Sequence, residues 1–167
     1  MPRPELPGFD HPYSPFEVEY TEGANVGYRW YEKQSLTPLF PFGFGLSYTR
    51  YAIRNLELAS NETITASVDV TNEGSREGEE TVQIYATPPA NGGPGVMRLI
   101  GWSKVDLKPR ETRHVSIAAD PRLLAHFDTT ENEWNIAAGD YTVMAGECSV
   151  QPSATAHVVL QERKIKP

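Results

Sequence analysis

Apolar and polar residues alternate along much of the chain. From Ile64 to Val70 every second residue is apolar, and the residues between them are Thr, Ser or Asp. A period of two is that of a β-strand that buries one face. Shorter runs with the same alternation lie at 82–86, 115–117, 141–145 and 156–160. The pattern therefore predicts a protein built from short, half-buried strands.

Two slips in the alternation predict β-bulges, in which one strand of a pair contains an extra residue. The apolar positions 51 and 53 are one residue out of phase with 56 and 58, so we expect a bulge near Arg54 and Asn55. Positions 100 and 102 slip in the same way against 105 and 107. This second slip predicts another bulge, near Ser103.

Polar, glycine-containing segments separate the predicted strands. Residues 72–78 (Asn-Glu-Gly-Ser-Arg-Glu-Gly) suit a hairpin loop, so the strands on either side are predicted to pair with each other. Asp120 followed by Pro121 combines an N-cap residue with proline at the first helical position, which predicts one short helical turn. Residues 91–95 are predicted to form a mobile loop, because most of them are Gly or Pro.

At least seven short strands at near-regular spacing, without a long segment of helical period, are typical of an immunoglobulin or fibronectin type III sandwich. We therefore predict an all-β, antiparallel β-sandwich. Residues 1–19 contain five prolines, at positions 2, 4, 7, 12 and 15. Because proline fixes φ and removes an amide donor, this part is expected to be an extended N-terminal arm that can lie along a partner.

Composition narrows the classes of function. A chain of 167 residues has room for one domain and an appendage, whereas a (β/α)8 barrel alone needs about 250 residues. The net charge of −7 and the scattered Lys and Arg residues argue against a nucleic-acid partner. No apolar run has the roughly 20 residues of a membrane span, and Cys148 is the only cysteine, so neither a membrane partner nor an internal disulfide is expected.

No residue pattern indicates catalysis, a metal or a cofactor. The four histidines (His11, His114, His126 and His157) lack metal-ligand spacing, and no nucleophile elbow or phosphate-binding loop occurs. Acidic residues fall in expected turns and strand edges, where a solvated surface role is the usual one. These residues are Glu79, Glu80, Asp128, Glu131 and Glu133. We therefore assign no catalytic, metal-binding or cofactor-binding residue.

A longer signature precedes the predicted sandwich. It contains Glu22-Gly23, then Val26-Gly27-Tyr28-Arg29-Trp30-Tyr31, then Pro38-Leu39-Phe40-Pro41-Phe42-Gly43-Phe44-Gly45-Leu46-Ser47-Tyr48-Thr49. This stretch resembles the one near the C-terminal end of family 3 glycoside hydrolases, the β-glucosidase and β-xylosidase group. Later motifs such as Val82-Gln83-Ile84-Tyr85 and Gly139-Asp140-Tyr141-Thr142-Val143 resemble their fibronectin type III-like domain. The chain departs from the family at Trp102 and Arg110, where Phe and Gly are common, and in the insertion at 91–95.

The resemblance implies a division into three parts. Residues 1–48 would be the arm and the tail of the upstream catalytic-region domain, 49–163 the fibronectin type III-like domain, and 164–167 a C-terminal tail. In this family the two catalytic carboxylates lie in upstream domains, which implies a non-catalytic chain from a retaining β-glycosidase. The implied role is structural, with the upstream catalytic domains as the partner. The expected interdomain anchors are Tyr28, Arg29, Phe40, Phe42 and Phe44.

Two alternative functions remain open at the level of sequence. Flat aromatic faces stack on sugar rings, so Trp30, Trp102 and Trp134 are weak candidates for a carbohydrate-binding module. The aromatic residues Tyr28, Trp30 and Tyr31 would promote self-association if they were exposed. The second alternative is an interaction module that drives dimerisation of the parent enzyme. Core or interface packing is the commoner role for such residues.

Overall fold

The computed structural model describes residues 21–61, 63–89 and 95–167. Strands dominate this part of the chain, and its two helices are short. In chain order the elements are α1 (Tyr28–Lys33), β1 (Tyr51–Ser60), β2 (Ile64–Asn72), β3 (Gly78–Thr87), β4 (Arg98–Leu107), β5 (Thr112–Ala118), α2 (Pro121–Leu124), β6 (His126–Asp128), β7 (Glu133–Ile136), β8 (Gly139–Gly146), β9 (Ala154–Leu160) and β10 (Arg163–Ile165).

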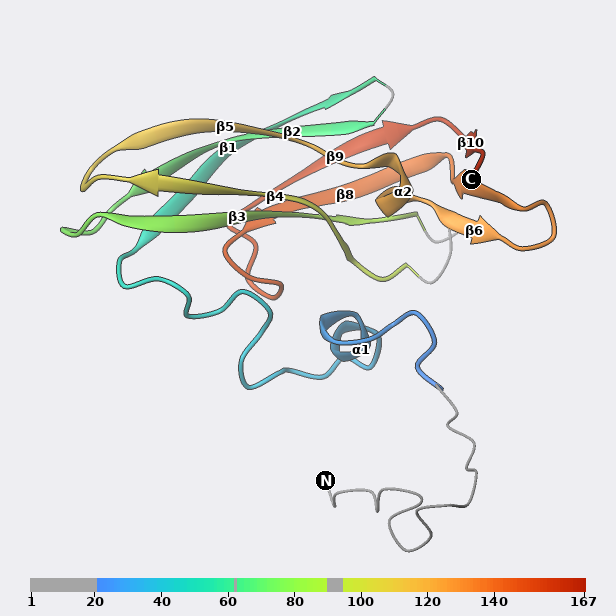
Figure 1. Ribbon diagram of the computed structural model, residues 1–167, viewed down its shortest axis with the longest axis horizontal. Helices are drawn as coiled ribbons and strands as arrows, with labels where there is room; N and C mark the ends of the chain where they lie inside the picture. Colours follow the sequence, from blue (N-terminus) through green and yellow to red (C-terminus); the bar gives the residue numbers. More distant parts are fainter. Residues whose placement is uncertain (1–20, 62, 90–94) are drawn as a thin grey trace, which may run out of the picture.

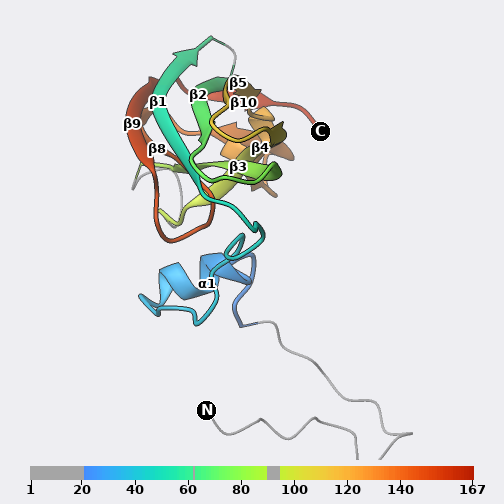
Figure 2. The same ribbon diagram turned by 90° about the vertical axis from the view of Figure 1, so that its left-hand side faces the viewer.

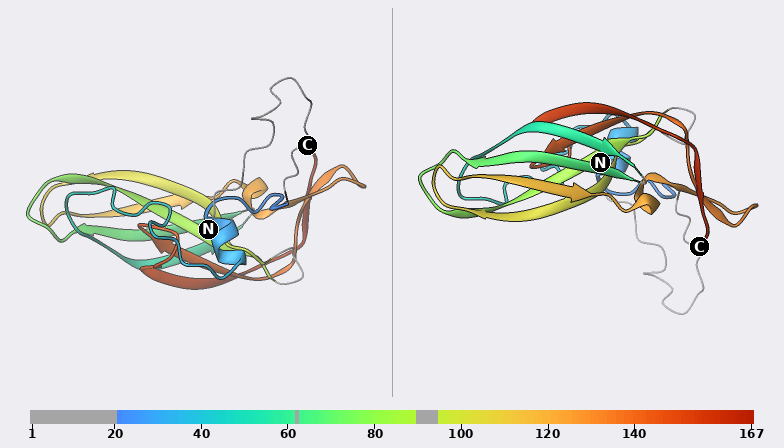
Figure 3. Two further views of the ribbon diagram at one scale, coloured as in Figure 1. Left: turned by 90° about the horizontal axis from the view of Figure 1, so that it is seen from below. Right: turned by 90° about the horizontal axis from the view of Figure 1, so that it is seen from above.

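Two antiparallel sheets pack face to face. One has the strand order β1-β2-β5 and the other β4-β3-β8-β9 (Figures 1 and 2). A small third sheet, β10-β7-β6, extends past one end of the sandwich (Figure 3). The predicted all-β sandwich of fibronectin type III type is therefore confirmed.

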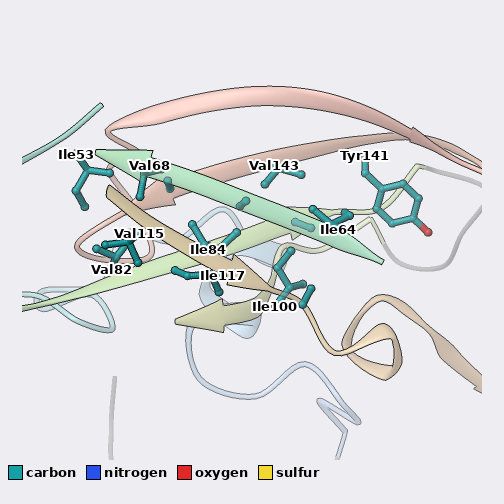
Figure 4. Packing of buried hydrophobic residues seen from close by; sticks show 14 of the residues in the cluster. Ile53, Ile64, Val68, Val82, Ile84, Ile100, Val115, Ile117, Tyr141 and Val143 are labelled. Carbon is teal, nitrogen blue, oxygen red and sulfur yellow. The ribbon is translucent and has the colours of Figure 1, made fainter. Parts of the chain in front are cut away.

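The core lies between the two main sheets, as the alternation predicted. Every second residue of β2 from Ile64 onwards is buried, and Val68 is paired with Val115 of β5. From the opposite sheet, Ile84 of β3 and Val143 of β8 point into the same space (Figure 4). Burying side chains of this size stabilises a fold by roughly 1.5–3 kcal/mol each.

The predicted bulge in β1 is confirmed. Arg54 pairs with Asp69 and Glu57 with Ser67, so β1 has one more residue than β2 in this interval. Asn55 takes φ +56, a left-handed conformation that asparagine tolerates better than most residues. Its side-chain amide donates to Asp69 Oδ2 over 2.8 Å, which holds the bulge against β2.

The bulge predicted near Ser103 was wrong, because the pairing of Ser103 with Val82 is regular. The extra residue is Ile100, since Ile84 pairs with Gly101 and Tyr85 with Leu99. A Cβ on Gly101 would lie 2.6 Å from Ile117 Cγ2. Only glycine leaves room there for Ile100 to turn into the core beside it.

The predicted β2–β3 hairpin was also wrong, because these strands belong to opposite sheets. Residues 72–78 cross from one sheet to the other, and Asn72 is fully buried at the start of the crossover. Its Nδ2 donates to the backbone oxygens of Leu107 (3.0 Å) and Arg76 (2.7 Å). Its Oδ1 accepts from Gly74 N and Thr49 Oγ1, each at 3.0 Å. The side chain thus supplies the hydrogen bonds that a hairpin ladder would otherwise supply.

Of the other local predictions, one is confirmed and two fall mostly or wholly on residues that the structure does not describe. The helical turn after Asp120 is confirmed as α2, with Asp120 Oδ1 accepting from Arg122 N at 2.9 Å. Arg110 takes φ +65, the conformation that the family's usual glycine would favour. Helix α1 was not predicted. The proline-rich residues 1–19 and most of the 91–95 loop lie outside the described residues.

Replacing Asn72 by alanine should destabilise the fold by about 2 kcal/mol or more, because the change leaves buried backbone groups without partners. Urea denaturation of the chain measures the effect. The control is Ser116→Ala, which removes one exposed hydrogen bond and should change the free energy of unfolding by less than about 0.5 kcal/mol. Equal effects of the two substitutions would contradict this role for Asn72.

Candidate functional site

The N-terminal segment, residues 21–50, lies against the outer face of the four-stranded sheet (Figures 1 and 2). In β3, Val82, Ile84 and Ala86 face the core, so Gln83 and Tyr85 face outward. Both outward residues are nevertheless buried, with exposed fractions of 3% and 2%. The N-terminal segment and the loop after β8 cover them.

Helix α1 is held by its side chains to the edge strand β4. Tyr28 Oη accepts from Leu99 N at 2.8 Å, and Glu32 Oε2 accepts from Met97 N at 2.9 Å. An edge strand has backbone N–H groups without a strand partner, and these two side chains pair two such groups at the start of β4. The Tyr28 ring also packs edge-on against Tyr85, with 5.7 Å between ring centroids. Burial raises the pKa of Glu32, and the hydrogen bond from Met97 N and the nearby Arg29 partly offset the rise.

A second attachment lies at Phe42 and Gly43. Ser149 N donates to the backbone oxygen of Phe42 at 3.0 Å, and the Phe42 ring lies 5.8 Å from that of Tyr28. Gly43 takes φ +91, and a Cβ there would overlap the Gln83 side chain and approach Glu147 O to 2.5 Å. Gln83 is itself fixed, because its Nε2 donates to Glu147 O at 2.8 Å. The backbone at Gly43 thus lies in direct contact with the sandwich.

The five expected interdomain anchors take different positions. Tyr28 is partly buried against the sandwich, and the ring of Phe42 contacts the ring of Tyr28. Arg29 Nη2 donates to Asn25 Oδ1 at 3.2 Å, while its Nε is buried without a hydrogen-bond partner. Phe40 and Phe44 are exposed by 72% and 55%. Tyr28 therefore attaches the segment to its own sandwich, whereas the side chains of Phe40 and Phe44 remain largely exposed.

Exposed apolar side chains follow one another along the N-terminal segment. We call this set the apolar row: Leu36, Leu39, Phe40, Phe42, Phe44, Leu46 and Tyr48. Leu39 is 87% exposed and Tyr48 is fully exposed. A run of large apolar side chains on a held segment is the usual mark of a protein–protein contact.

The three tryptophans lie on separate elements. Trp30 is in α1, where it lines a shallow hollow with Val26 and Tyr31. Trp102 is 63% exposed on the outer face of β4, where the displaced bulge directs it. Trp134 of β7 is partly buried and packs edge-on against Phe127 at 5.1 Å. Packing therefore occupies Trp134, whereas most of the Trp102 side chain is left uncovered by the described residues.

An acidic recess of about 490 Å³ lies beneath the last part of the N-terminal segment. Its lining includes Gly43, Leu46, Ser47, Tyr51, Glu80 and Glu147. Glu80 is only 7% exposed, so its predicted surface position was wrong. The alternation itself contained the correct signal, because Glu80 is in phase with Val82 and Ile84. Burial and the neighbouring Glu147 raise the pKa of Glu80 to about 7.

In residues 21–61, 63–89 and 95–167, no three His, Cys, Asp or Glu side chains gather as a metal site requires. No helix in these ranges has the length and apolar character needed to cross a bilayer. Cys148 is buried beside the recess.

The comparisons with known proteins agree with this architecture. Residues 80–149 match the fibronectin type III-like domain family. The chain is 38% identical to β-glucosidase B of Emericella nidulans over 160 residues, which are 90% of this chain and 19% of the relative. It is 36% identical to thermostable β-glucosidase B of Acetivibrio thermocellus, over 79% of this chain and 18% of the relative. The chain thus spans less than a fifth of the length of these relatives.

Solved structures give the same result. DesR, a β-glucosidase from Streptomyces venezuelae, superposes with a TM-score of 0.80 at 34% identity, over 85% of this chain and 19% of that one. β-Glucosidase 3B from Thermotoga neapolitana gives 0.81 at 32% identity, over 89% and 21%. The family 3 β-glucosidase of Bifidobacterium adolescentis gives 0.79 at 36% identity, over 84% and 21%.

Fold and matches together define a fibronectin type III-like domain with an N-terminal segment packed on its outer face. The resemblance seen in the sequence is confirmed. The chain belongs to the family 3 glycoside hydrolases, as the C-terminal part that contains their fibronectin type III-like domain.

Replacing Gly43 by alanine should release the N-terminal segment, because the new Cβ would meet both a side chain and a backbone oxygen. Gly45→Ala is the matched control, since Gly45 also has positive φ, +75, but nothing lies within 4 Å of its Cβ position. Hydrogen exchange of residues 41–49 should speed up in G43A far more than in G45A. Equal exchange in the two variants would show that Gly43 does not hold the segment.

Glu80 should make the stability of the chain depend on pH. Its pKa is about 7 in the folded state, against the ordinary 4.5 of a glutamate in an unfolded chain. The bound proton therefore stabilises the fold below pH 4.5, and this contribution is lost as the pH rises through 7. A shift of this size corresponds to roughly 3 kcal/mol, and solvent screening at the open side of the recess lowers that figure.

The substitution E80Q should remove this dependence and stabilise the chain at pH 8, with little effect at pH 4. Urea denaturation at both pH values measures it. Glu57→Gln, on an exposed position of β1, is the control for loss of one negative charge. An unchanged pH profile in E80Q would contradict the raised pKa.

Proposed function

We propose that the chain is the non-catalytic, structural part of a retaining β-glycosidase of the β-glucosidase type, and that it braces the upstream catalytic domains. The observation that supports this most directly is the apolar row. It stays exposed although the segment that carries it is fixed to the sandwich at Tyr28, Phe42 and Gly43. A fixed apolar surface is suited to docking, because little conformational freedom is lost on binding.

The length of the relatives supports a partner within the same polypeptide. Four fifths of each relative lies outside the region that this chain matches. A retaining glycosidase needs two carboxylates about 5–5.5 Å apart and a site that accepts a sugar. In this proposal those groups belong to the upstream domains, and the boundary between them and the sandwich lies near residue 49.

The bracing would act through burial of the apolar row. Full burial of one Leu or Phe side chain is worth roughly 1.5–3 kcal/mol, so a few of these residues account for a stable contact. Arg29 would add a polar anchor, because its buried Nε lacks a hydrogen-bond partner within the described chain and guanidinium can pair with partner carboxylates or carbonyls. Tyr28 and Phe42 attach the N-terminal segment to the outer face of the four-stranded sheet. These two attachments would set the position of the apolar row.

The two alternatives have less support. Carbohydrate binding would rest on Trp102, because Trp134 is packed and Trp30 lies on a separate element. Homo-oligomerisation would use the same apolar row against a second copy. Sedimentation of the purified chain over a range of concentrations tests this, since a dimer through the row would dissociate in row variants.

The double substitution F44S/L46S in the whole parent enzyme should lower its melting temperature by several degrees. In the isolated chain it should have little effect, because both side chains are already exposed. Val159→Ser, at a 64% exposed apolar position on β9, is the matched control and should change neither protein. Thermal melting and kcat on an aryl β-glucoside are the measurements. Unchanged melting with lost turnover would contradict bracing and point to a role in the chemical step.

A further inference from the structure

The acidic recess contains two carboxylates and no cation. Glu80 is 7% exposed, and Glu147 is partly buried on the same recess wall. None of the described residues that line the recess is Lys, Arg or His. Lys104 lines an adjoining hollow together with Glu80 and Glu147, but its ion pair is with Glu79. Arg50, Arg76 and Arg110 line a second adjoining hollow. The charge of the recess is therefore unbalanced within the described chain.

A third polar group is directed into the same space. Tyr51 is 91% buried, and its hydroxyl has no hydrogen-bond partner among the described residues. Burial raises the pKa of this hydroxyl, the Ser47 hydroxyl lowers it in part, and the nearby carboxylates Glu80 and Glu147 add to the rise. Buried hydroxyls are normally paired, so an unpaired one beside two carboxylates indicates a missing donor. A guanidinium or ammonium group supplies such donors to carboxylate and phenol oxygens together.

The recess is continuous with the surface proposed for docking. Phe44 and Leu46 belong to the apolar row, and both also line the recess. A domain that docks on the row would therefore cover the mouth of the recess. Burial against that domain would strengthen any ion pair formed inside it, since water would be excluded.

We propose that the recess formed by Glu80, Glu147 and the Tyr51 hydroxyl is the receptor for one basic side chain, Arg or Lys, from the upstream catalytic region of the parent enzyme. This inference rests on the proposed bracing function. It adds a polar contact that fixes the position of the upstream domains on the sandwich. In the isolated chain the two carboxylates repel each other. In the assembled enzyme the same two carboxylates hold the inserted cation.

A divalent metal fits the recess less well. Two carboxylates and one neutral phenol provide few of the six to eight oxygen ligands that Ca²⁺ takes. The described residues also offer no cluster of three acidic or imidazole ligands. The two carboxylates and the unpaired phenol suit an organic cation with several N–H donors instead.

The proposal predicts that one substitution changes the melting temperature in opposite directions in the isolated chain and in the parent enzyme. At pH 8, E80Q should raise the melting temperature of the isolated chain, because it removes an unpaired buried charge. In the parent enzyme E80Q should lower the melting temperature, because it leaves the inserted cation without its partner. E147Q should behave in the same way, and E57Q should change neither protein. Stabilisation by E80Q in both proteins would overturn the proposal.

Binding of a small cation gives an independent measurement. Methylguanidinium, titrated at pH 8 against an equal concentration of NaCl, should shift the amide resonances of residues 43–49 and 147–153 in a saturable way. E80Q should weaken this binding by about tenfold, whereas E57Q should not. Non-saturable shifts, equal shifts in E80Q, or stronger saturable binding of Ca²⁺ at the same amides would each count against a basic side chain.

The source of the cation is also open to test. Arg3 is the only Lys or Arg in residues 1–20, so R3Q should leave the recess amides of the isolated chain unchanged. Shifts in R3Q would assign the recess to this chain's own arm and overturn the upstream source. The result is separable from the bracing function: if F44S/L46S weakens the parent while E80Q strengthens it, docking stands and the cation receptor fails.

Discussion

The contact between the N-terminal segment and the outer face of the four-stranded sheet is the constraint on which the rest of the arrangement depends. Gln83 and Tyr85 occupy outward positions of β3, yet they are as buried as the core. Tyr85 donates to Gln83 Oε1, and Gln83 in turn holds the loop that receives Phe42 and Gly43. Because one side of the segment is committed to these contacts, the side chains of its apolar row stay largely exposed.

The sequence predicted most of the fold, since a period of two is a local signal and the strands are strongly amphipathic. The two errors in the predicted fold, the β2–β3 hairpin and the position of the bulge in β4, arose where strand connection or pairing depends on tertiary contacts. Residues 72–78 read as a hairpin because glycine and polar residues suit any tight turn, whereas the choice between a hairpin and a crossover is made by the buried Asn72 side chain. The bulge at Ile100 depends on Gly101 lying against Ile117, a residue distant in sequence.

The functional surface was less predictable for a related reason. Aromatic residues at 28–48 identify a family signature, but composition does not tell which of them face the sandwich. The structure divides them, with Tyr28 packed against Tyr85 and with Phe40 and Phe44 largely exposed. For Glu80, by contrast, the sequence contained the correct signal. Its phase with Val82 and Ile84 placed it on the inner face, and only the general rule that carboxylates are solvated pointed elsewhere. A buried acid that breaks this rule marks a site where a further group is needed.

Hydrogen exchange of residues 36–48, compared between the isolated chain and the whole parent enzyme, tests the central claim most directly. If the apolar row docks on the upstream domains, these amides exchange much more slowly in the parent, while the core amides of β2 and β8 exchange at similar rates in both. Equal exchange of residues 36–48 in the two proteins would contradict the claim that this surface braces the enzyme.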